Sequence, residues 1–438
     1  MMINPVLLGV VLLCLLCLMR LNVLLALLIS VYASGLTAGM SIGEISGLIT
    51  SGFSRNGETA LSYILLGTLA SSMAYTGIAD ILGRKVAHAI RGKKMVMLLV
   101  FAGISCLSQN IIPVHIAFIP IMIPPLLLLM NELKLDRRAM ACSLAFGLKA
   151  PYIAVPIGFG SIFQGIIVKN MTENGMEVTI SDVASVNWIL ALAMLFGLMI
   201  AILVTYRPSR DYENLTLATQ EEQFSDKLEK KHWVTIVALL VITLMQIMYG
   251  LEKWDTSLSL SAMVGLLILI LGGAIKWRDI DAQFYGGVKI MGFIAFIMLV
   301  AGGFANVMQA TGGVEDLVDA AVSLMGGSKL VAATMITGIG LLVTMGIGSS
   351  FSTIPVLAMI YVPLCARMGF SSSATILLIA AAAALGDAGS PASDTTLGPT
   401  SGLNADGQHN HIWDTCIPTF LHFNIPLMIA AILGSQIL

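Results

Sequence analysis

Three charged side chains interrupt long apolar stretches of this chain. Lys149 lies in one stretch, and Asp387 and Asp394 lie in another. A charge at the centre of a bilayer costs roughly 2.5–3.5 kcal/mol on insertion scales, so such residues usually mark an ion or substrate pathway. Lys149 and Asp387 can bind the two ends of a zwitterion, close as a salt bridge that opens on protonation, or form a structural ion pair. Asp394 is the better candidate for a carboxylate that binds sodium and a proton in competition.

Hydroxyl and amide side chains gather where the apolar stretches are broken by Gly and Pro. Their neutral oxygens suit sodium or hydrogen bonds to a polar solute. Ser and Thr also form hydrogen bonds between packed membrane helices, so both roles stay open for each residue. The candidate binding residues of this kind are Ser108, Gln109, Asn110, Ser349, Ser350, Ser352, Thr353, Ser390, Ser393 and Thr395, with His115 as a further candidate.

A group of His and Asp residues near the C-terminal end is a third candidate for chemistry. His409 and His411, with Asp406 and Asp414, can bind a metal or sense pH, but they lack the spacing of ligands on a helix. We therefore expect a polar loop there rather than a metal site. The sequence also shows no metal-ligand set, no phosphate loop and no nucleophile beside a base, so we expect neither an enzyme nor a bound cofactor. The expected coupling ions are Na+, H+ or both.

The composition indicates which elements must position these residues. The chain is 57% hydrophobic and only 11% charged, whereas an ordinary soluble domain has about a quarter charged residues. Most of its surface should therefore face lipid, and no basic tract suggests a nucleic-acid partner. Apolar stretches predict about ten transmembrane helices, at residues 5–19, 21–40, 61–82, 139–168, 188–206, 233–251, 258–275, 290–310, 374–403 and 413–433.

Two further segments predict re-entrant hairpins. Residues 95–130 and 330–366 are too long for one crossing, and polar residues next to Pro interrupt each near its middle. Irregular backbone at membrane depth is tolerated only where it lines a cavity or is buried in protein. The hairpin tips should therefore approach the binding site.

Short sequence matches predict that the chain contains an internal repeat. The run Met73–Gly77 parallels Met308–Gly312, and each run precedes a hairpin. We expect a first repeat at 1–206, a cytoplasmic linker at 207–232 and a second repeat at 233–438. Each repeat has five crossings and a hairpin, and because five is odd the second repeat must be inverted. Inversion should bring the broken helices of both halves together near the midplane.

The distribution of Lys and Arg predicts the orientation. With the hairpins returning to the side they left, seventeen of the 23 Lys and Arg residues lie on one face and five on the other, and Lys149 lies within the membrane. Positive residues accumulate on cytoplasmic loops. The linker should therefore be cytoplasmic, and both termini should lie outside.

Two of these segments also resemble a known family. The segment from Ser108 to Pro113 and, above all, the segment from Gly386 through Asp394 and Thr395 to His409 resemble the NhaC-type sodium/proton antiporter family of hairpin-containing ion transporters. The resemblance covers nearly the whole chain. It implies cation-coupled transport across the bacterial inner membrane, by an elevator motion of a hairpin-bearing domain against a dimeric scaffold. Similar members move amino acids or small carboxylates, so the resemblance leaves the solute open.

Three functions compete at this point. Opposite charges at paired breaks favour a cation-coupled carrier of a small solute, most simply an amino acid. Asp387 and Asp394 are equally compatible with a sodium/proton antiporter that has no organic substrate. A channel or membrane enzyme is the third possibility, but matched hairpins favour a site exposed alternately to the two sides. The carrier is our expectation.

Overall fold

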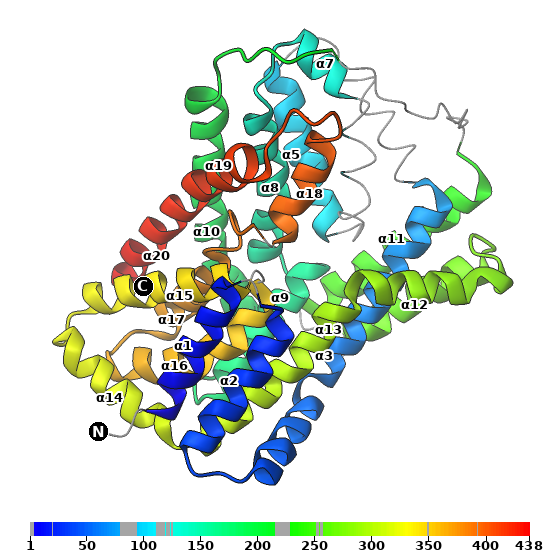
Figure 1. The fold of residues 1–438 in the computed structure, drawn as a ribbon. Helices are drawn as coiled ribbons and strands as arrows, with labels where there is room; N and C mark the ends of the chain where they lie inside the picture. The colour runs from blue at the N-terminus through cyan, green and yellow to red at the C-terminus, as the bar shows by residue number, and fades with distance from the viewer. Residues whose placement is uncertain are drawn as a thin grey trace.

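The computed structural model describes residues 4–19, 21–78, 94–110, 119, 123, 126–214, 228–250, 254, 257–347, 350–391 and 393–438. Every regular element in these ranges is a helix (Figure 1). A helix satisfies its own backbone hydrogen bonds, which lipid cannot do. The predicted all-α fold is confirmed for these ranges.

The first half contains eight described α-helices, the last of which continues as a short π-helix. They are α1 (Pro5–Leu18), α2 (Val23–Thr37), α3 (Ile42–Thr76), α5 (Lys94–Asn110), α7 (Leu127–Glu132), α8 (Arg137–Ala154), α9 (Phe159–Glu173), α10 (Ile180–Ile200) and η2 (Ala201–Thr205).

The described helices of the second half follow a related order. They are α11 (Lys230–Gly250), α12 (Leu258–Leu271), η3 (Trp277–Asp279), α13 (Ile280–Ala310), α14 (Gly313–Met325), α15 (Lys329–Ile347), α16 (Ser350–Arg367), α17 (Ser372–Ala384), α18 (Asp394–Leu403), η4 (His411–Cys416), α19 (Ile417–Thr419), η5 (Phe420–Asn424) and α20 (Ile425–Ile437).

The longest two described helices, α3 and α13, pack side by side (Figure 1). Glycines permit the contact: a Cβ on Gly52 would lie 2.4 Å from the amide nitrogen of Gly303, and one on Gly287 would lie 2.3 Å from that of Thr68. These pairings run in opposite directions along the two sequences, so the helices are antiparallel. Small residues of this kind let membrane helices approach to backbone contact.

Fewer helices are long enough to cross a bilayer than the sequence predicts. Among the described residues, three qualify by length and composition, at Ile180–Thr205, Ser350–Arg367 and His411–Ile437. Two bent pairs raise the number to five, and six shorter apolar helices accompany them. The expected ten crossings therefore stay a prediction, as do the repeats and the domain boundaries.

The second predicted hairpin corresponds to α15 and α16. Tyr361 of α16 donates a hydrogen bond to the carbonyl of Ile336 in α15, at 3.0 Å. The ammonium of Lys329, at the start of α15, lies 5.4 Å from the ring centroid of Phe370, just after α16. The pair is thus antiparallel and returns beside its starting point. The first predicted hairpin, 95–130, comprises α5, α7 and an intervening stretch largely outside the described residues.

Helix breaks are present at both places where Gly and Pro predict them. α8 and α9 meet at a 47° bend, where Gly158 has a φ of +62°. A Cβ on Gly160 would lie 1.8 Å from the carbonyl oxygen of Val155, so only glycine fits there. α17 ends at Ala384, and α18 begins ten residues later at Asp394.

Residues 207–214 form a strap that touches both halves. Lys94 donates to the hydroxyl of Ser209 at 2.9 Å, and the amide of Asn131 donates to the carbonyl of Glu213 at 3.1 Å. The backbone amide of Glu213 in turn donates to Gln408 at 2.8 Å. The first residues of the predicted linker therefore join α5 and α7 to the loop after α18.

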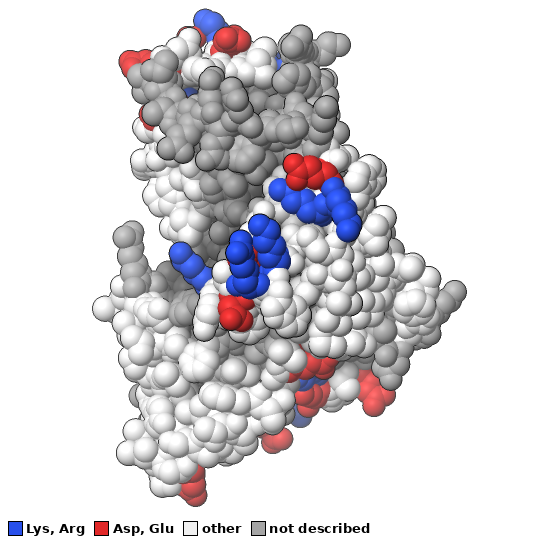
Figure 2. All heavy atoms as spheres, turned by 90° about the vertical axis from the view of Figure 1, so that its right-hand side faces the viewer, with Lys and Arg blue, Asp and Glu red and all other residues white. Residues whose placement is uncertain are grey.

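The face formed by α11, α12 and α13 separates charged from uncharged surface. Figure 2 shows Lys and Arg gathered there in a band, with largely uncharged surface below it. The described Lys and Arg residues of α11, of α13 and of the connection between α12 and α13 are Lys230, Lys231, Lys276, Arg278 and Lys289.

Candidate functional site

The candidate site is built on the break between α17 and α18. Gly386 and Gly389 have φ angles of +81° and +101°, which only glycine adopts without strain. A Cβ on Gly386 would lie 2.6 Å from the carbonyl of Leu341 in α15, and one on Gly389 would lie 2.6 Å from the Cβ of Phe420. The loop is thus pressed between the hairpin and η5, and it holds Asp387 in the protein interior.

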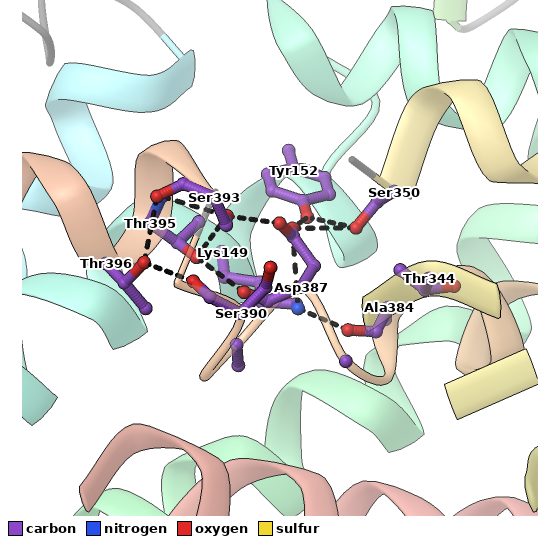
Figure 3. Close-up of polar contacts among 12 residues, drawn as sticks. Lys149, Tyr152, Thr344, Ser350, Ala384, Asp387, Ser390, Ser393, Thr395 and Thr396 are labelled. Atoms are coloured by element: carbon purple, nitrogen blue, oxygen red, sulfur yellow. Dashed lines mark hydrogen bonds and ion pairs between the residues drawn. The ribbon is translucent and has the colours of Figure 1, made fainter. Parts of the chain in front are cut away.

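The Asp387 carboxylate is surrounded by donors from three elements (Figure 3). Its Oδ2 accepts hydrogen bonds from Ser350 of α16 at 2.8 Å and from Tyr152 of α8 at 3.1 Å. Its Oδ1 accepts one from the hydroxyl of Ser393. The residue is only 5% exposed. A buried carboxylate needs this number of partners, because an isolated buried charge is strongly unfavourable.

Lys149 supplies the matching positive charge. Its ammonium lies 3.4 Å from Asp387 Oδ2 and donates a hydrogen bond to the carbonyl of Ala384, and the side chain is fully buried. Ala384 is the last residue of α17, where unpaired carbonyls give the helix end a partial negative charge. The lysine therefore neutralises both a carboxylate and a helix end.

Hydroxyl groups extend the polar cluster along the start of α18. Ser393 caps this helix by accepting from the amide of Thr395, and its hydroxyl lies 2.8 Å from that of Thr395. Thr395 donates to the carbonyl of Asp387 at 3.1 Å, while Thr396 donates to the carbonyl of Ser390 at 2.5 Å. The break thus concentrates oxygen atoms beside a carboxylate, which is the chemistry that binds hard cations.

A second polar cluster ties α8 to the loop after α18. Arg137, at the start of α8, is fully buried and makes two hydrogen bonds to Asp406, at 2.7 and 2.6 Å. It also donates to the carbonyl of Leu403 and to Asn131, both at 3.0 Å, and its guanidinium lies 4.3 Å from the ring centroid of Tyr212 in the strap. α8 is therefore attached to the second half both at Lys149 and at Arg137.

The His and Asp residues near the C-terminal end form part of this polar loop. Asp414 accepts from Arg210 at 2.7 Å, and the buried His409 bonds to the hydroxyl of Thr415 at 2.7 Å. Burial lowers the pKa of His409 to about 4, so its ring is neutral at physiological pH. Within the described residues, no group of three His, Cys, Asp or Glu side chains is placed to hold a metal ion.

Comparison with protein families shows which family this chain belongs to. Residues 143–432, which include Lys149 and the whole break around Asp387, match the model of the Na+/H+ antiporter family, and residues 4–90 match a second model described as a Na+-H+ antiporter family. The chain belongs to the Na+/H+ antiporter family. The resemblance found in the sequence is thus confirmed. Membership makes the protein a membrane transporter.

Three relatives match this chain over nearly their full lengths. An uncharacterized membrane protein of Vibrio parahaemolyticus is 47% identical, covering 99% of this chain and 100% of the relative. A Bacillus subtilis protein called "Putative amino acid transporter YuiF" is 43% identical with the same coverage. An uncharacterized membrane protein of Haemophilus influenzae is 42% identical, covering 97% of each chain.

Two solved transporters share the fold of this antiporter-family chain. The YdaH transporter of Alcanivorax borkumensis has a TM-score of 0.61 at 12% identity, covering 90% of this chain and 86% of that one. MtrF of Neisseria gonorrhoeae, described among antimetabolite efflux pumps, has a TM-score of 0.57 at 15% identity, covering 90% and 84%. At these identities the comparison shows the fold alone.

The structure brings together part of the predicted site. Ser350, Ser390, Ser393 and Thr395 lie with Lys149 and Asp387 around the break. Ser352 and Thr353 are buried one turn along α16, and the Ser352 hydroxyl has no partner among the described residues. His115, Ser349 and the side chains of Ser108, Gln109, Asn110 and Asp394 lie outside the described part of the chain.

Two functional candidates were missed in the sequence. Tyr152 follows Lys149 by three residues, and this spacing could have shown that both side chains lie on one face of α8. Thr396 continues the hydroxyl run after Asp394 and was open to the same reasoning as Thr395.

Proposed function

We propose that this family member is a cation-coupled secondary transporter of a small amino-acid-like solute in the bacterial inner membrane, with Asp387 as the coupling carboxylate. One observation carries the proposal: a buried carboxylate in a broken helix is paired with a lysine 3.4 Å away and ringed by hydroxyl oxygens. Charges inside membrane proteins usually mark transport pathways.

Competition at one carboxylate explains how Na+ and H+ would be coupled. A sodium ion needs several oxygen ligands, and Asp387, Ser350, Ser393 and Thr395 supply them within one cluster. A proton on Asp387 removes the charge that attracts the cation. In this structure the Lys149 ammonium is the cation that contacts the Asp387 carboxylate. A sodium ion would take its place there. The sequence favours Asp394 for this role, but the described donors converge on Asp387.

The opposite charges of Lys149 and Asp387 support a zwitterionic cargo. An amino acid carries both charges, so its carboxylate can replace Asp387 as the partner of Lys149 while its ammonium replaces Lys149. Neither buried charge is then left without a partner. The name of the Bacillus subtilis relative refers to the same solute class.

A second candidate is a sodium/proton antiporter without an organic substrate. The specific observation in its favour is the direct contact between the lysine and the carboxylate, because 3.4 Å leaves no space for a zwitterion between them. Under this alternative the pair opens only for a cation. The family name is compatible with either function.

The architecture supports the proposed mechanism of alternating access. Inverted repeats would give antiparallel packing of α3 and α13 and similar helix breaks in both halves. We extend the proposal to an elevator-type motion in which the hairpins and broken helices move against a scaffold containing α3 and α13. A homodimer built on that scaffold completes the proposal.

Uptake by reconstituted protein tests the cargo directly. Proteoliposomes with an imposed Na+ or pH gradient are expected to accumulate at least one radiolabelled amino acid several-fold above liposomes in which both gradients have been collapsed. Sodium-driven proton movement without uptake of any amino acid in the panel would favour the antiporter alternative. Absence of both responses would contradict the proposed function.

Cysteine labelling tests the orientation. In a variant without its six native cysteines, Ser225→Cys is expected to resist a membrane-impermeant maleimide in intact cells and to react after permeabilisation, because the Lys and Arg distribution places the linker in the cytoplasm. Labelling in sealed cells would reverse the topology.

A further inference from the structure

The side chain of Asn424 binds the backbone on both sides of Asp387. Its Oδ1 accepts a hydrogen bond from the amide of Gly386 at 3.2 Å, and its Nδ2 donates one to the carbonyl of Ala388 at 2.8 Å. Both bonds are buried, and Asn424 is only 2% exposed. One side-chain amide thus holds the residue before Asp387 and the residue after it.

The position of Asn424 in the fold explains this geometry. It is the last residue of η5, one of two π-helical turns before α20. π-helical turns are rare in proteins as a whole, and those that occur are often at functional sites. The adjacent loop has no room to shift toward η5, since a Cβ on Gly389 would lie 2.6 Å from the Cβ of Phe420 and 2.9 Å from its Cα.

The helix α10, which the predicted repeat pairs with the segment containing Asn424, has a similar contact. Asn187 of α10 donates to the carbonyl of Ile153 near the end of α8, at 3.1 Å. This contact has one bond where Asn424 has two, and the two bonds of Asn424 lie on either side of the one carboxylate of the described cluster. Asn187 thus binds one backbone group of a broken helix, whereas Asn424 binds the two backbone groups that flank a buried carboxylate.

We propose that Asn424 is a positioning residue that fixes the backbone of Asp387 so that its carboxylate faces Lys149, Ser350 and Ser393. The proposal rests on the proposed function, because it assigns Asn424 a role through the cation site. Without the amide, the glycine-rich loop retains many conformations. The carboxylate then has to be ordered each time a cation binds, which lowers affinity.

Two substitutions distinguish positioning from packing. Asn424→Ala removes both bonds and is expected to lower apparent sodium affinity about tenfold at every pH. The carboxyl introduced by Asn424→Asp, when protonated, can still accept from Gly386 and donate to Ala388. When ionised it repels the Ala388 carbonyl and Asp387. Relative to the unsubstituted protein at the same pH, the aspartate variant should therefore have nearly equal sodium affinity at acidic pH and a lower affinity as the pH rises.

Hydrogen exchange gives a readout that does not depend on transport. The Gly386 amide in full-length purified protein is expected to exchange about tenfold faster in Asn424→Ala. Asn306→Ala is the matched control, because that amide also makes two hydrogen bonds, to the Leu48 carbonyl at 3.3 Å and to Ser51 at 3.2 Å, but within the contact of α3 and α13. The control should change neither exchange at Gly386 nor sodium affinity.

The outcomes separate this inference from the proposed function. Unchanged exchange at Gly386 in Asn424→Ala would show that the two hydrogen bonds of Asn424 do not order the loop. Faster exchange with unchanged sodium affinity, and no new pH dependence in Asn424→Asp, would reduce Asn424 to a packing role and overturn the inference. If the unsubstituted protein shows no response to sodium or to any amino acid, the proposed function fails, and the cation-site role of Asn424 fails with it. Hydrogen exchange at Gly386 still tests whether the two hydrogen bonds of Asn424 order the loop.

Discussion

Asp387→Asn is expected to lower cation-coupled transport by at least about a hundredfold. The amide keeps the size of the side chain but cannot exchange a sodium ion for a proton, and it leaves the buried Lys149 without a counter-charge. Hydrogen bonds to a charged group contribute about 1.5–3 kcal/mol each, so losing two accounts for the factor. Sodium-driven uptake or proton exchange in proteoliposomes measures the effect.

Lys149→Met and the double variant Lys149→Met with Asp387→Asn determine what the pair does. Removing one member of a buried pair costs about 3–5 kcal/mol, whereas removing both can be nearly neutral. If the pair is only structural, the double variant should recover thermal stability and much of the transport. If the pair binds ligand, stability should recover while transport does not.

Asp394→Asn is the matched comparison for the coupling carboxylate. The sequence favours Asp394 and the described geometry favours Asp387, so the two single variants should differ sharply. Normal coupling in Asp387→Asn, combined with its loss in Asp394→Asn, would transfer the role to Asp394.

Arg137→Met is expected to destabilise the protein by about 3–5 kcal/mol, because it leaves Asp406 buried without its guanidinium partner. Burial alone would raise the pKa of Asp406, but the bonds from Arg137 and from the amide of Gln408 outweigh it and lower that pKa. The stabilisation is therefore fully present at neutral pH, and it is lost as the pH falls through the depressed pKa. Thermal unfolding in detergent measures the change.

An exposed ion pair beside the strap provides the control. Lys134 and Asp211 lie 2.9 Å apart, but their side chains are 59% and 81% exposed. Exposed pairs contribute little to stability, so Lys134→Met should leave unfolding unchanged. The double variant Arg137→Met with Asp406→Leu should recover part of the loss. Equal unfolding of Arg137→Met and the native protein would contradict a structural role for the buried pair.

Local sequence signals were sufficient for the break and its charges. Gly386 and Gly389 lie where the backbone needs a positive φ, and a charge inside an apolar stretch identified Lys149 and Asp387. These features depend on residues close together in the sequence, so composition and spacing reveal them. The family resemblance rested on the same segment.

Contacts between distant segments were not predictable in this way. Arg137 counts in the sequence as one of the cytoplasmic loop charges, yet it is fully buried, because Asp406, more than 260 residues away, neutralises it. Asn424 is one polar residue in an apolar helix, and its two bonds exist only because η5 is packed against the break. No local pattern specifies either approach.

The glycine-lined contact of α3 and α13 also constrains the order of biosynthesis. The end of α3 leaves the ribosome roughly 230 residues before the end of α13 does, which at about 5–20 residues per second is an interval of about 10–50 seconds. During that interval the backbone surface around Gly52 and Thr68 has no partner helix and faces lipid or the insertion machinery. Final assembly of the first half therefore waits for translation of the second.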